Sequence, residues 1–565
     1  MTDTCDLVVV GAGAGGLSAA VVAATLGLKV IVLEKEPVFG GTTAWSGGWL
    51  WIPRNAMARA AGIEEDVAAP RRYLQNEIGP RLDDARVAAY LEHAPRMVEY
   101  FRANTAVDFI EGNGIPDFHT RTPGSAVKGR SVGSMPFDAR ALGARVADLR
   151  PPHALLALRT MGIASGAELR HFFDALHAWR SFAYVARLMA RLVRDLALHG
   201  RSMRLVNGNA LVARLAKSAF DRDVELRVGA PVERVLTQAG RVAGVVYRDA
   251  DGEHSITARR GVVLACGGFP HDPQRIRALI PHAPTGREHF SAAPRSNTGD
   301  GLRLGESMGG VVDDSLAAAG AWAPVSRVPR PDGTTINYPH LIERAKPGLI
   351  AVLRSGARFI NEAESYYDFV EAMVAAVPSQ PEAWVLCDHR FIRRYGLGAV
   401  RPAPFRLAPW VRSGYLQRAD TVDALAGRCG IDAPGLARTI ARYNIAARDG
   451  RDTEFGRGET PFNRLHGDPR HHPNPCVAPI ERAPYYAVKV VPGSLGTFAG
   501  LRADASARVL NHSGHPIPGL YVCGNDMNSI MGGRYPSGGI TLGPAMTFAY
   551  LAAHDAAGVA PPVTP

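Results

Sequence analysis

The stretch Asp6-Leu-Val-Val-Val10-Gly11-Ala-Gly13-Ala-Gly-Gly16 decides the fold of this chain. Residues 6–10 predict a buried parallel strand, the apolar segment 17–26 predicts a helix, and residues 29–33 predict a second strand that ends at Glu34. The glycines permit a tight turn, close approach of a pyrophosphate and close packing of the helix. The pattern therefore predicts a dinucleotide site, with the pyrophosphate at the helix N-terminus. Its predicted members are Gly11, Gly13, Ala14, Gly15, Gly16, Glu34 and Lys35.

Three further glycine-rich loops indicate FAD rather than NAD. Residues 40–48 combine glycines with hydroxyl side chains, which suits a loop pressed against a pyrophosphate and a flavin edge. The strand at 519–523 runs into a loop where flavoproteins commonly place an acid that binds ribitol; Asn525 stands there in this chain. A buried strand at 261–265 ends in another glycine pair. The loops add Gly41, Thr42, Thr43, Ser46, Gly47, Gly48, Gly268, Gly524 and Asn525 to the predicted FAD site.

Composition restricts the class of protein. The 565 residues allow three or four domains, and 46% hydrophobic with 21% charged residues is typical of a soluble globular protein and argues against disorder. The net charge of +11 comes from scattered residues, nearly all arginine, which indicates a bacterial GC-rich source and favours no nucleic-acid partner. The six cysteines form no C-x-x-C pair, so no metal site is predicted. Without a signal-peptide pattern or an 18-residue apolar run, we expect a cytoplasmic location.

Other stretches resemble the 3-ketosteroid Δ1-dehydrogenases, within the fumarate reductase/succinate dehydrogenase flavoprotein superfamily. The resemblance rests on residues 40–48, 358–366, 452–458, 484–487 and 531–548, the last being the most specific. It implies an α/β fold with a Rossmann-type FAD-binding domain (1–285 and 494–565, with a helical segment at about 85–200) and an inserted α+β catalytic domain (286–493). The superfamily's covalent-FAD histidine is absent from 40–48, so we expect non-covalent FAD.

The resemblance also assigns the chemistry of ketone desaturation. It requires a polarised carbonyl, a base that removes the α-proton, and delivery of the β-hydrogen as hydride to flavin N5. The Tyr535 hydroxyl and the Gly539 N–H are implied as two donors to the enolate oxygen. The helix expected from Ile540 to Ala553 would direct its positive end at the flavin, with Thr541 and Leu542 among its first residues.

The implied base is Tyr366, with Tyr367 as the rival by one position. Free tyrosine titrates near pH ~10, so the base must be ionised in the protein or assisted by a neighbouring group. The candidate helpers are Arg344, Arg354 and Arg358.

A third tyrosine of the family is missing from Pro116-Asp-Phe118-His119. Two interpretations stay open. Phe118 can form a wall of the substrate pocket, or His119 can relay the proton from Tyr366 and add a limb near pH ~6–7 to the pH profile. We favour the Phe118 wall, because one aromatic ring replaces another.

Residues 169–198 predict one long amphipathic helix in which arginines interleave with Phe172, Phe173, Leu176, Trp179, Ala183, Leu188 and Leu192. Such a helix usually packs on its own domain, in part over the substrate pocket. Peripheral contact with an anionic membrane is the alternative.

The sequence thus predicts an FAD-dependent oxidoreductase that desaturates a 3-ketosteroid or a related cyclic ketone and passes electrons to an external acceptor. A desaturase of small cyclohexanone-type ketones and a fumarate-reductase-like enoate reductase are the alternatives. The enoate reductase requires an arginine acid where Tyr366 stands. A non-catalytic flavin module would not need Tyr366 or Tyr535.

Overall fold

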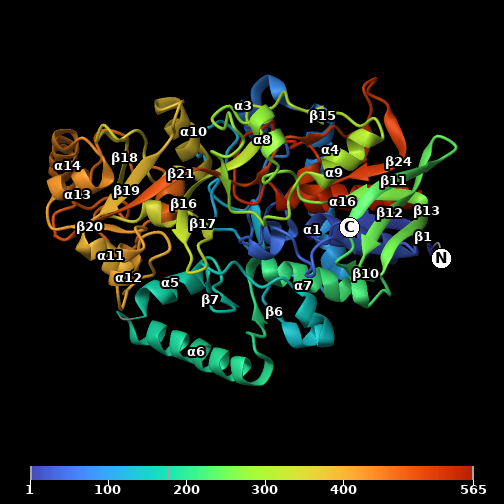
Figure 1. Ribbon diagram of the computed structural model, residues 1–565, viewed down its shortest axis with the longest axis horizontal. Coiled ribbons are helices and arrows are strands. Elements are labelled where there is room, and N and C mark those ends of the chain that lie inside the picture. Colours follow the sequence, from blue (N-terminus) through green and yellow to red (C-terminus); the bar gives the residue numbers. More distant parts are fainter. Residues whose placement is uncertain (1–2, 176, 563–565) are drawn as a thin grey trace.

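The computed structural model describes residues 3–175 and 177–562 and contains two large sheets. They lie at opposite ends of the longest axis of the molecule (Figure 1). The sheet that contains the N-terminal strand lies on the right of that view, and the sheet built mainly from the middle of the chain lies on the left.

The first sheet is parallel at its centre, where the glycine turn lies. The strand, helix and strand predicted around that turn form as β1, α1 (Ala14–Thr25) and β2. Strand β13 is long enough to pair with β1 along its length, with β24 at its end and with antiparallel β12 nearer its start. The strands are β1 (Asp3–Val10), β2 (Val30–Glu34), β10 (Glu225–Val228), β11 (Val232–Gln238), β12 (Arg241–Asp249), β13 (Gly252–Leu264), β23 (Arg508–Leu510) and β24 (Pro516–Val522).

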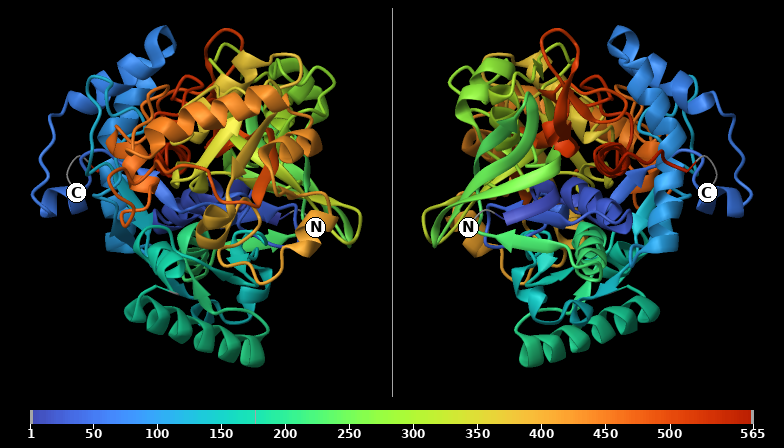
Figure 2. Two further views of the ribbon diagram at one scale, coloured as in Figure 1. Left: turned by 90° about the vertical axis from the view of Figure 1, so that its left-hand side faces the viewer. Right: turned by 90° about the vertical axis from the view of Figure 1, so that its right-hand side faces the viewer.

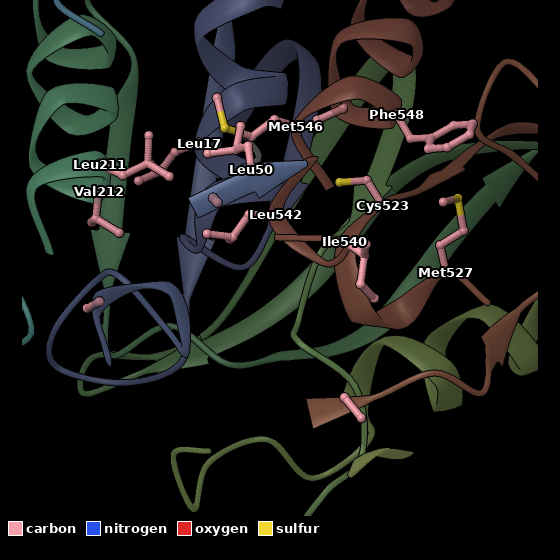
Figure 3. Packing of buried hydrophobic residues seen from close by; sticks show 14 of the residues in the cluster. Leu17, Leu50, Leu211, Val212, Cys523, Met527, Ile540, Leu542, Met546 and Phe548 are labelled. Carbon is pink, nitrogen blue, oxygen red and sulfur yellow. The ribbon is translucent and has the colours of Figure 1, made fainter. Parts of the chain in front are cut away.

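Helix α1 is enclosed by two helices distant in sequence, α7 (Asn207–Phe220) and α16 (Leu542–Ala557). Figure 3 shows the apolar side chains of this region, including Leu17 of α1, Leu211 of α7 and Met546 of α16. All three side chains are fully buried. Because burial of each large apolar side chain contributes about 1.5–3 kcal/mol, this packing fixes α16 against α1 and brings the loop before α16 to the glycine turn.

The second sheet is mostly antiparallel and is centred on β21. Its strands are β14 (Phe290–Ser291), β16 (Gly320–Pro329), β17 (Thr335–Pro339), β18 (Leu349–Val352), β19 (Ala383–Cys387), β20 (Gln417–Ala419) and β21 (Tyr485–Thr497). The predicted domain boundary at 493/494 falls inside β21, which pairs with β14 and β16 through Ser494. The division into 1–285 with 494–565 and 286–493 otherwise stays a prediction.

The segment at 85–200, expected to be helical, is α-helical only at its two ends. Helix α4 (Asp84–Asn104) opens it, and short strands and a 3-10 stretch (Ala139–Asp148) follow. These strands are β4 (Phe109–Glu111), β5 (Ser131–Ser134), β6 (Phe137–Asp138), β7 (Ala157–Leu158) and β8 (Met161–Gly162), and they pair within the segment or with β3 (Trp49–Trp51) and β9 (Arg204–Leu205).

The single long helix expected over 169–198 is wrong, because two helices form there. They are α5 (Ala167–Asp174) and α6 (Trp179–His199), and the predicted face member Leu176 lies outside the described residues. Helix α6 runs along the outer edge of the molecule in all three views (Figures 1 and 2). Leu188 and Leu192 are buried against Met161, whereas Trp179 is 77% exposed, so the predicted apolar face does not pack along its whole length.

The remaining helices are α2 (Ala56–Ala60), α3 (Ala69–Ile78), α8 (Pro273–Leu279), α9 (Asp300–Ser307), α10 (Tyr366–Ala376), α11 (His389–Tyr395), α12 (Ala408–Arg412), α13 (Val422–Cys429), α14 (Ala433–Ala447) and α15 (Pro461–His466). Strands β15 (Val312–Asp313) and β22 (Gly500–Leu501) form a separate pair. Within residues 3–175 and 177–562, no helix has both the length and the apolar character needed to cross a bilayer.

Candidate active site

A cavity of about 1080 Å³ extends from the glycine turn to the second sheet. This volume exceeds the roughly 300–1,000 Å³ typical of single-ligand sites, which suits a dinucleotide together with a substrate. Most of the residues predicted to bind FAD line it: Gly11, Gly13, Ala14, Gly15, Glu34, Lys35, Gly41, Thr42, Thr43, Ser46, Gly47, Gly48, Gly524, Asn525, Gly539, Thr541 and Leu542. Gly16 and Gly268 do not line it.

The glycines of the first turn are required by close backbone approaches. Gly11 has φ +104°, and a Cβ there would lie 2.3 Å from the Ala265 carbonyl oxygen. A Cβ at Gly16 would lie 1.9 Å from the Gly11 oxygen, so Gly16 serves helix packing behind the cavity. Gly13 precedes α1 without a side-chain cap of its own, and apart from the Ala14 N–H, which donates to the Thr43 Oγ1, the positive end of the helix faces the cavity. This arrangement fits a pyrophosphate.

Glu34 lies at the end of β2 and is buried. Its carboxylate accepts hydrogen bonds from the backbone N–H groups of Ala12 and Glu36, each at 3.0 Å. Burial raises the pKa of Glu34 above its ordinary value, while these two bonds act in the opposite direction. Each oxygen retains acceptor capacity, so the position fits a ribose hydroxyl.

The loop at 40–48 lies directly opposite the first glycine turn. A Cβ at Gly41 would lie 3.7 Å from the Gly13 Cα, and the Thr43 Oγ1 accepts a hydrogen bond from the Ala14 N–H at 3.0 Å. The Thr42 Oγ1 accepts one from the Asn297 Nδ2 at 2.9 Å. Asn297 lines the cavity and was missed by the sequence reasoning, because a lone asparagine in a loop carries no pattern.

In the loop that follows β24, the acidic residue Asp526 does not line the cavity. Asn525 lines the cavity, but the next residue, Asp526, is fully buried and does not. The Asp526 carboxylate accepts hydrogen bonds from the N–H groups of Cys266 and Gly268, and burial raises its pKa to about 6. Gly268 therefore serves this internal contact, and its neighbour Gly267 lines the cavity instead.

Tyr366 and Tyr535 come from different elements and meet at the cavity. Tyr366 is the first residue of α10, which the Ser365 side chain caps by accepting from the Asp368 N–H. The two rings lie 5.0 Å apart between centroids at an interplanar angle of 80°. Burial and the neighbouring Tyr535 raise the pKa of Tyr366 well above its ordinary value. Burial also raises the pKa of Tyr535, against the effect of the Tyr366 and Thr541 hydroxyls.

Tyr367 does not face the cavity. Its hydroxyl donates to the Gly533 carbonyl at 2.7 Å and lies 3.1 Å from the Glu371 carboxylate. The ring is 1% exposed and belongs to the main core. Of these two adjacent tyrosines, Tyr366 therefore lines the cavity and Tyr367 packs in the hydrophobic core.

Of the three arginines considered as helpers, only Arg344 acts on Tyr366. Its charge lowers the pKa of Tyr366, against the larger effect of burial. The Arg344 guanidinium also donates to the carbonyls of Glu362 and Glu364, which fixes the segment before Tyr366. Arg354 and Arg358 are instead committed to ion pairs, Arg354 with Glu382 and Arg358 with Glu362 and Asp452.

Phe118 lines the cavity beside both tyrosines. Its ring stacks on Tyr535 at 5.7 Å and contacts Tyr366 edge-on at 5.5 Å. The Phe118 N–H donates to the Pro536 carbonyl at 3.0 Å, which fixes this segment to the loop that carries Tyr535.

His119 does not line the cavity, and both of its ring nitrogens are occupied. Nδ1 lies 2.6 Å from the Glu77 carboxylate and Nε2 lies 2.8 Å from the Asp368 carboxylate. Burial alone would lower the pKa of His119, but the bonds to Asp368 and Glu77 outweigh it and raise the pKa to about 10. The structure therefore favours Phe118 over a His119 relay, because His119 lies outside the cavity wall and both of its ring nitrogens contact carboxylates.

The helix after Gly539 starts two residues later than expected, at Leu542. Gly539 has φ +95°, and a Cβ there would lie 2.7 Å from the backbone of residues 49–51. Within the described chain its N–H has no hydrogen-bond partner, and the residue lines the cavity. One backbone donor and the Tyr535 hydroxyl are thus available at the same wall.

Known proteins match this chain over nearly its full length. A family model described as FAD binding domain matches residues 6–542. A 4-oxocyclohex-2-ene-1-carboxylate 5-dehydrogenase of Sinomonas cyclohexanicum is 39% identical over 565 residues, covering 99% of this chain and 95% of the relative. A 3-oxosteroid 1-dehydrogenase of Mycobacterium tuberculosis is 36% identical over 562 residues, covering 97% of each.

A solved structure is similar in fold as well as in sequence. It is the 3-ketosteroid delta1-dehydrogenase from Sterolibacterium denitrificans in complex with 1,4-androstadiene-3,17-dione. The TM-score is 0.90 at 37% identity, and the match covers 99% of this chain and 100% of the other.

Proposed function

Because the chain belongs to the FAD-binding flavoprotein family that includes the 3-oxosteroid 1-dehydrogenases, we propose that it desaturates a cyclic ketone next to its carbonyl. The substrate is a 3-ketosteroid or a smaller cyclic ketone; its relatives are named for a 3-oxosteroid and an oxocyclohexene carboxylate. The observation that carries the proposal is the meeting of Tyr366, Tyr535 and Gly539 at a cavity that also contains the glycine turn.

The residues at the wall supply complementary functions. The Tyr535 hydroxyl and the Gly539 N–H donate to the ketone oxygen, which stabilises the enolate that forms as the α-proton leaves. Tyr366 removes that proton, and the positive charge of Arg344 favours its ionised form. Phe118 forms the adjoining apolar wall and orients the ring of the substrate. When bound, FAD supplies the acceptor for the β-hydrogen as hydride.

The cofactor is proposed to bind without a covalent bond. The open N-terminus of α1 receives the pyrophosphate, Glu34 receives the ribose, and Thr42, Thr43 and Asn525 contact the remaining polar groups. The unit that contains the second sheet contributes Tyr366 and covers the substrate as a capping domain on the Rossmann-type FAD domain. Electrons then leave to an external acceptor.

An enoate reductase of the fumarate type is disfavoured by the residue at position 366. The fumarate-reductase branch carries an arginine as the acid at this position, and Tyr366 stands there in this chain. Reduction and desaturation are distinguished by mixing the oxidised holoenzyme anaerobically with ketones and with succinate. Bleaching by ketones alone supports desaturation, and bleaching by succinate contradicts it.

The outward face of α6 supports peripheral membrane contact. Trp179 and Phe182 stack at 5.6 Å and are 77% and 47% exposed, and Arg180 and Arg187 lie on the same helix. Exposed aromatic and basic side chains on one helix are typical of interfacial binding. Sedimentation with anionic vesicles tests this contact, and Trp179→Ser should release the protein. Unchanged sedimentation would show that the helix serves its own domain.

A further inference from the structure

One end of the cavity is polar, and the proposed reaction does not use it. Lys346 lies there directly after a short 3-10 turn (Glu343–Ala345) and is 8% exposed. Its ammonium donates to the Gly467 carbonyl at 2.8 Å and lies 5.1 Å from the centre of the Phe173 ring. Among residues 3–175 and 177–562, no carboxylate forms an ion pair with it.

Asp468 is the carboxylate whose charge acts most strongly on Lys346, but it already binds two other side chains. It accepts hydrogen bonds from the Tyr395 hydroxyl at 2.5 Å and from the Arg394 Nε at 2.8 Å. Arg170 and Arg394 add positive charge around Lys346. An ammonium enclosed in protein without an anionic partner is unfavourable, so this end of the cavity is suited to a ligand that brings a negative charge.

His466 adds a neutral polar group beside Lys346. Burial, Lys346 and Arg344 together lower its pKa to about 3, so its imidazole is uncharged at neutral pH. It lines the cavity, and within the described chain its ring nitrogens have no hydrogen-bond partner. A neutral imidazole can donate a second hydrogen bond to an anion that Lys346 holds.

An aromatic wall connects this polar end to the tyrosine pair. The ring of Phe118 stacks on Tyr535 at 5.7 Å and contacts Phe462 at 4.6 Å, and Phe462 contacts His466 at 5.4 Å. All four residues line the cavity. A ligand with its ketone at Tyr535 can therefore lie along an apolar surface and reach a cationic group with its other end.

We propose that the substrate is a cyclic ketone that carries a carboxylate, and that Lys346 binds this carboxylate while the ketone oxygen lies at Tyr535. The proposal rests on the ketone desaturation proposed above and specifies its substrate class. Lys346 acts as a specificity-determining residue, with His466 as the second donor.

The pH dependence of this preference follows from the surroundings of Lys346. Burial lowers its pKa to about 8, with Arg170 and Arg394 acting in the same direction and Asp468 and the Cys476 thiol acting against them. Below that pH the ammonium is charged, and a carboxylate is ionised above pH ~4. The preference for an acid over its ester should therefore be largest between pH ~5 and 8 and decline above about 8.

The test uses two acid–ester pairs with the oxidised holoenzyme and an artificial acceptor. The probes are 4-oxocyclohexanecarboxylate and 3-oxo-4-androstene-17β-carboxylate, each beside its methyl ester. Lys346→Met should lower kcat/KM for the acid roughly 10- to 100-fold, mainly through KM, and change the ester by less than ~3-fold. Lys346→Arg should retain most of the preference. The preferred acid shows whether the ring system is monocyclic or steroidal.

Lys489→Met is the matched control, because Lys489 pairs with Glu382 and does not line the cavity. It should leave both members of each pair unchanged. Equal losses for acid and ester in Lys346→Met would overturn the proposal. Should that variant lose FAD, the wild-type acid-to-ester ratio decides instead, since a ratio that stays constant from pH 6 to 10 also overturns it. If neither acids, esters nor uncharged ketones react with the wild-type enzyme, the proposed function itself fails.

Discussion

Replacing Tyr366 with phenylalanine removes the proposed base and leaves its ring in place. The ring packs edge-on against Phe118 and Tyr535, so the apolar contacts remain and FAD should stay bound. A positioned general base contributes about 10²–10⁴-fold. We expect turnover to fall at least ~100-fold, which corresponds to about 2.7 kcal/mol in the barrier.

The raised pKa of Tyr366 gives this prediction a second readout. Because burial holds the pKa well above 10, only a small fraction of the hydroxyl is ionised at neutral pH. The wild-type kcat/KM should therefore rise with pH through the neutral range and show no plateau below pH ~10. Tyr366→Phe should flatten this rise. Exchange of the ketone's α-proton in D2O should slow by a similar factor.

The adjacent residue supplies the control. Tyr367→Phe removes the hydroxyl that donates to the Gly533 carbonyl beside Glu371, outside the cavity, so stability should fall by about 1 kcal/mol while turnover changes less than ~3-fold. Tyr366 is not the base if Tyr367→Phe abolishes turnover while Tyr366→Phe is mild, or if Tyr366→Phe retains wild-type α-proton exchange.

Three further predictions follow from the same geometry. Tyr535→Phe removes one of two enolate donors and should lower turnover roughly 100-fold; α-proton exchange at the wild-type rate would show that the hydroxyl does not touch the carbonyl. His119→Gln should destabilise the protein most below pH 6.5 and progressively less as the pH rises through about 10, because the histidine pKa is raised in the folded state; a pH-independent difference in unfolding free energy would count against its two ion pairs. Acid precipitation should release FAD into the supernatant, and colour in the pellet would mean a covalent bond.

The glycine turn could be predicted from sequence because its spacing encodes a backbone requirement. Gly11 and Gly16 meet backbone oxygens at distances that no side chain tolerates, and such positions show as an unusual residue pattern. Glu34 follows from its place at the end of a predicted strand. The role of Tyr366 was predicted from a family resemblance. Which of Tyr366 and Tyr367 faces the cavity depends on helix α10, which begins at Tyr366.

Long-range contacts account for what sequence reasoning missed. Asn297 reaches Thr42 across more than 250 residues, and no local pattern signals that approach. His119 seemed free for proton transfer because Glu77 and Asp368 lie on helices far away in the chain. Lys346 carries no local sequence signal, because its burial without an ion-pair partner among the described residues is a property of the folded cavity.

An anaerobic titration measures whether a cyclic ketone reduces the bound flavin as it is desaturated. The oxidised holoenzyme is mixed with a saturated cyclic ketone, and the flavin absorbance and the conjugated enone are followed together. We expect the flavin to bleach as one enone forms per flavin, and succinate to leave the spectrum unchanged. Bleaching by succinate, or an unchanged spectrum with both monocyclic and steroidal ketones, would contradict it.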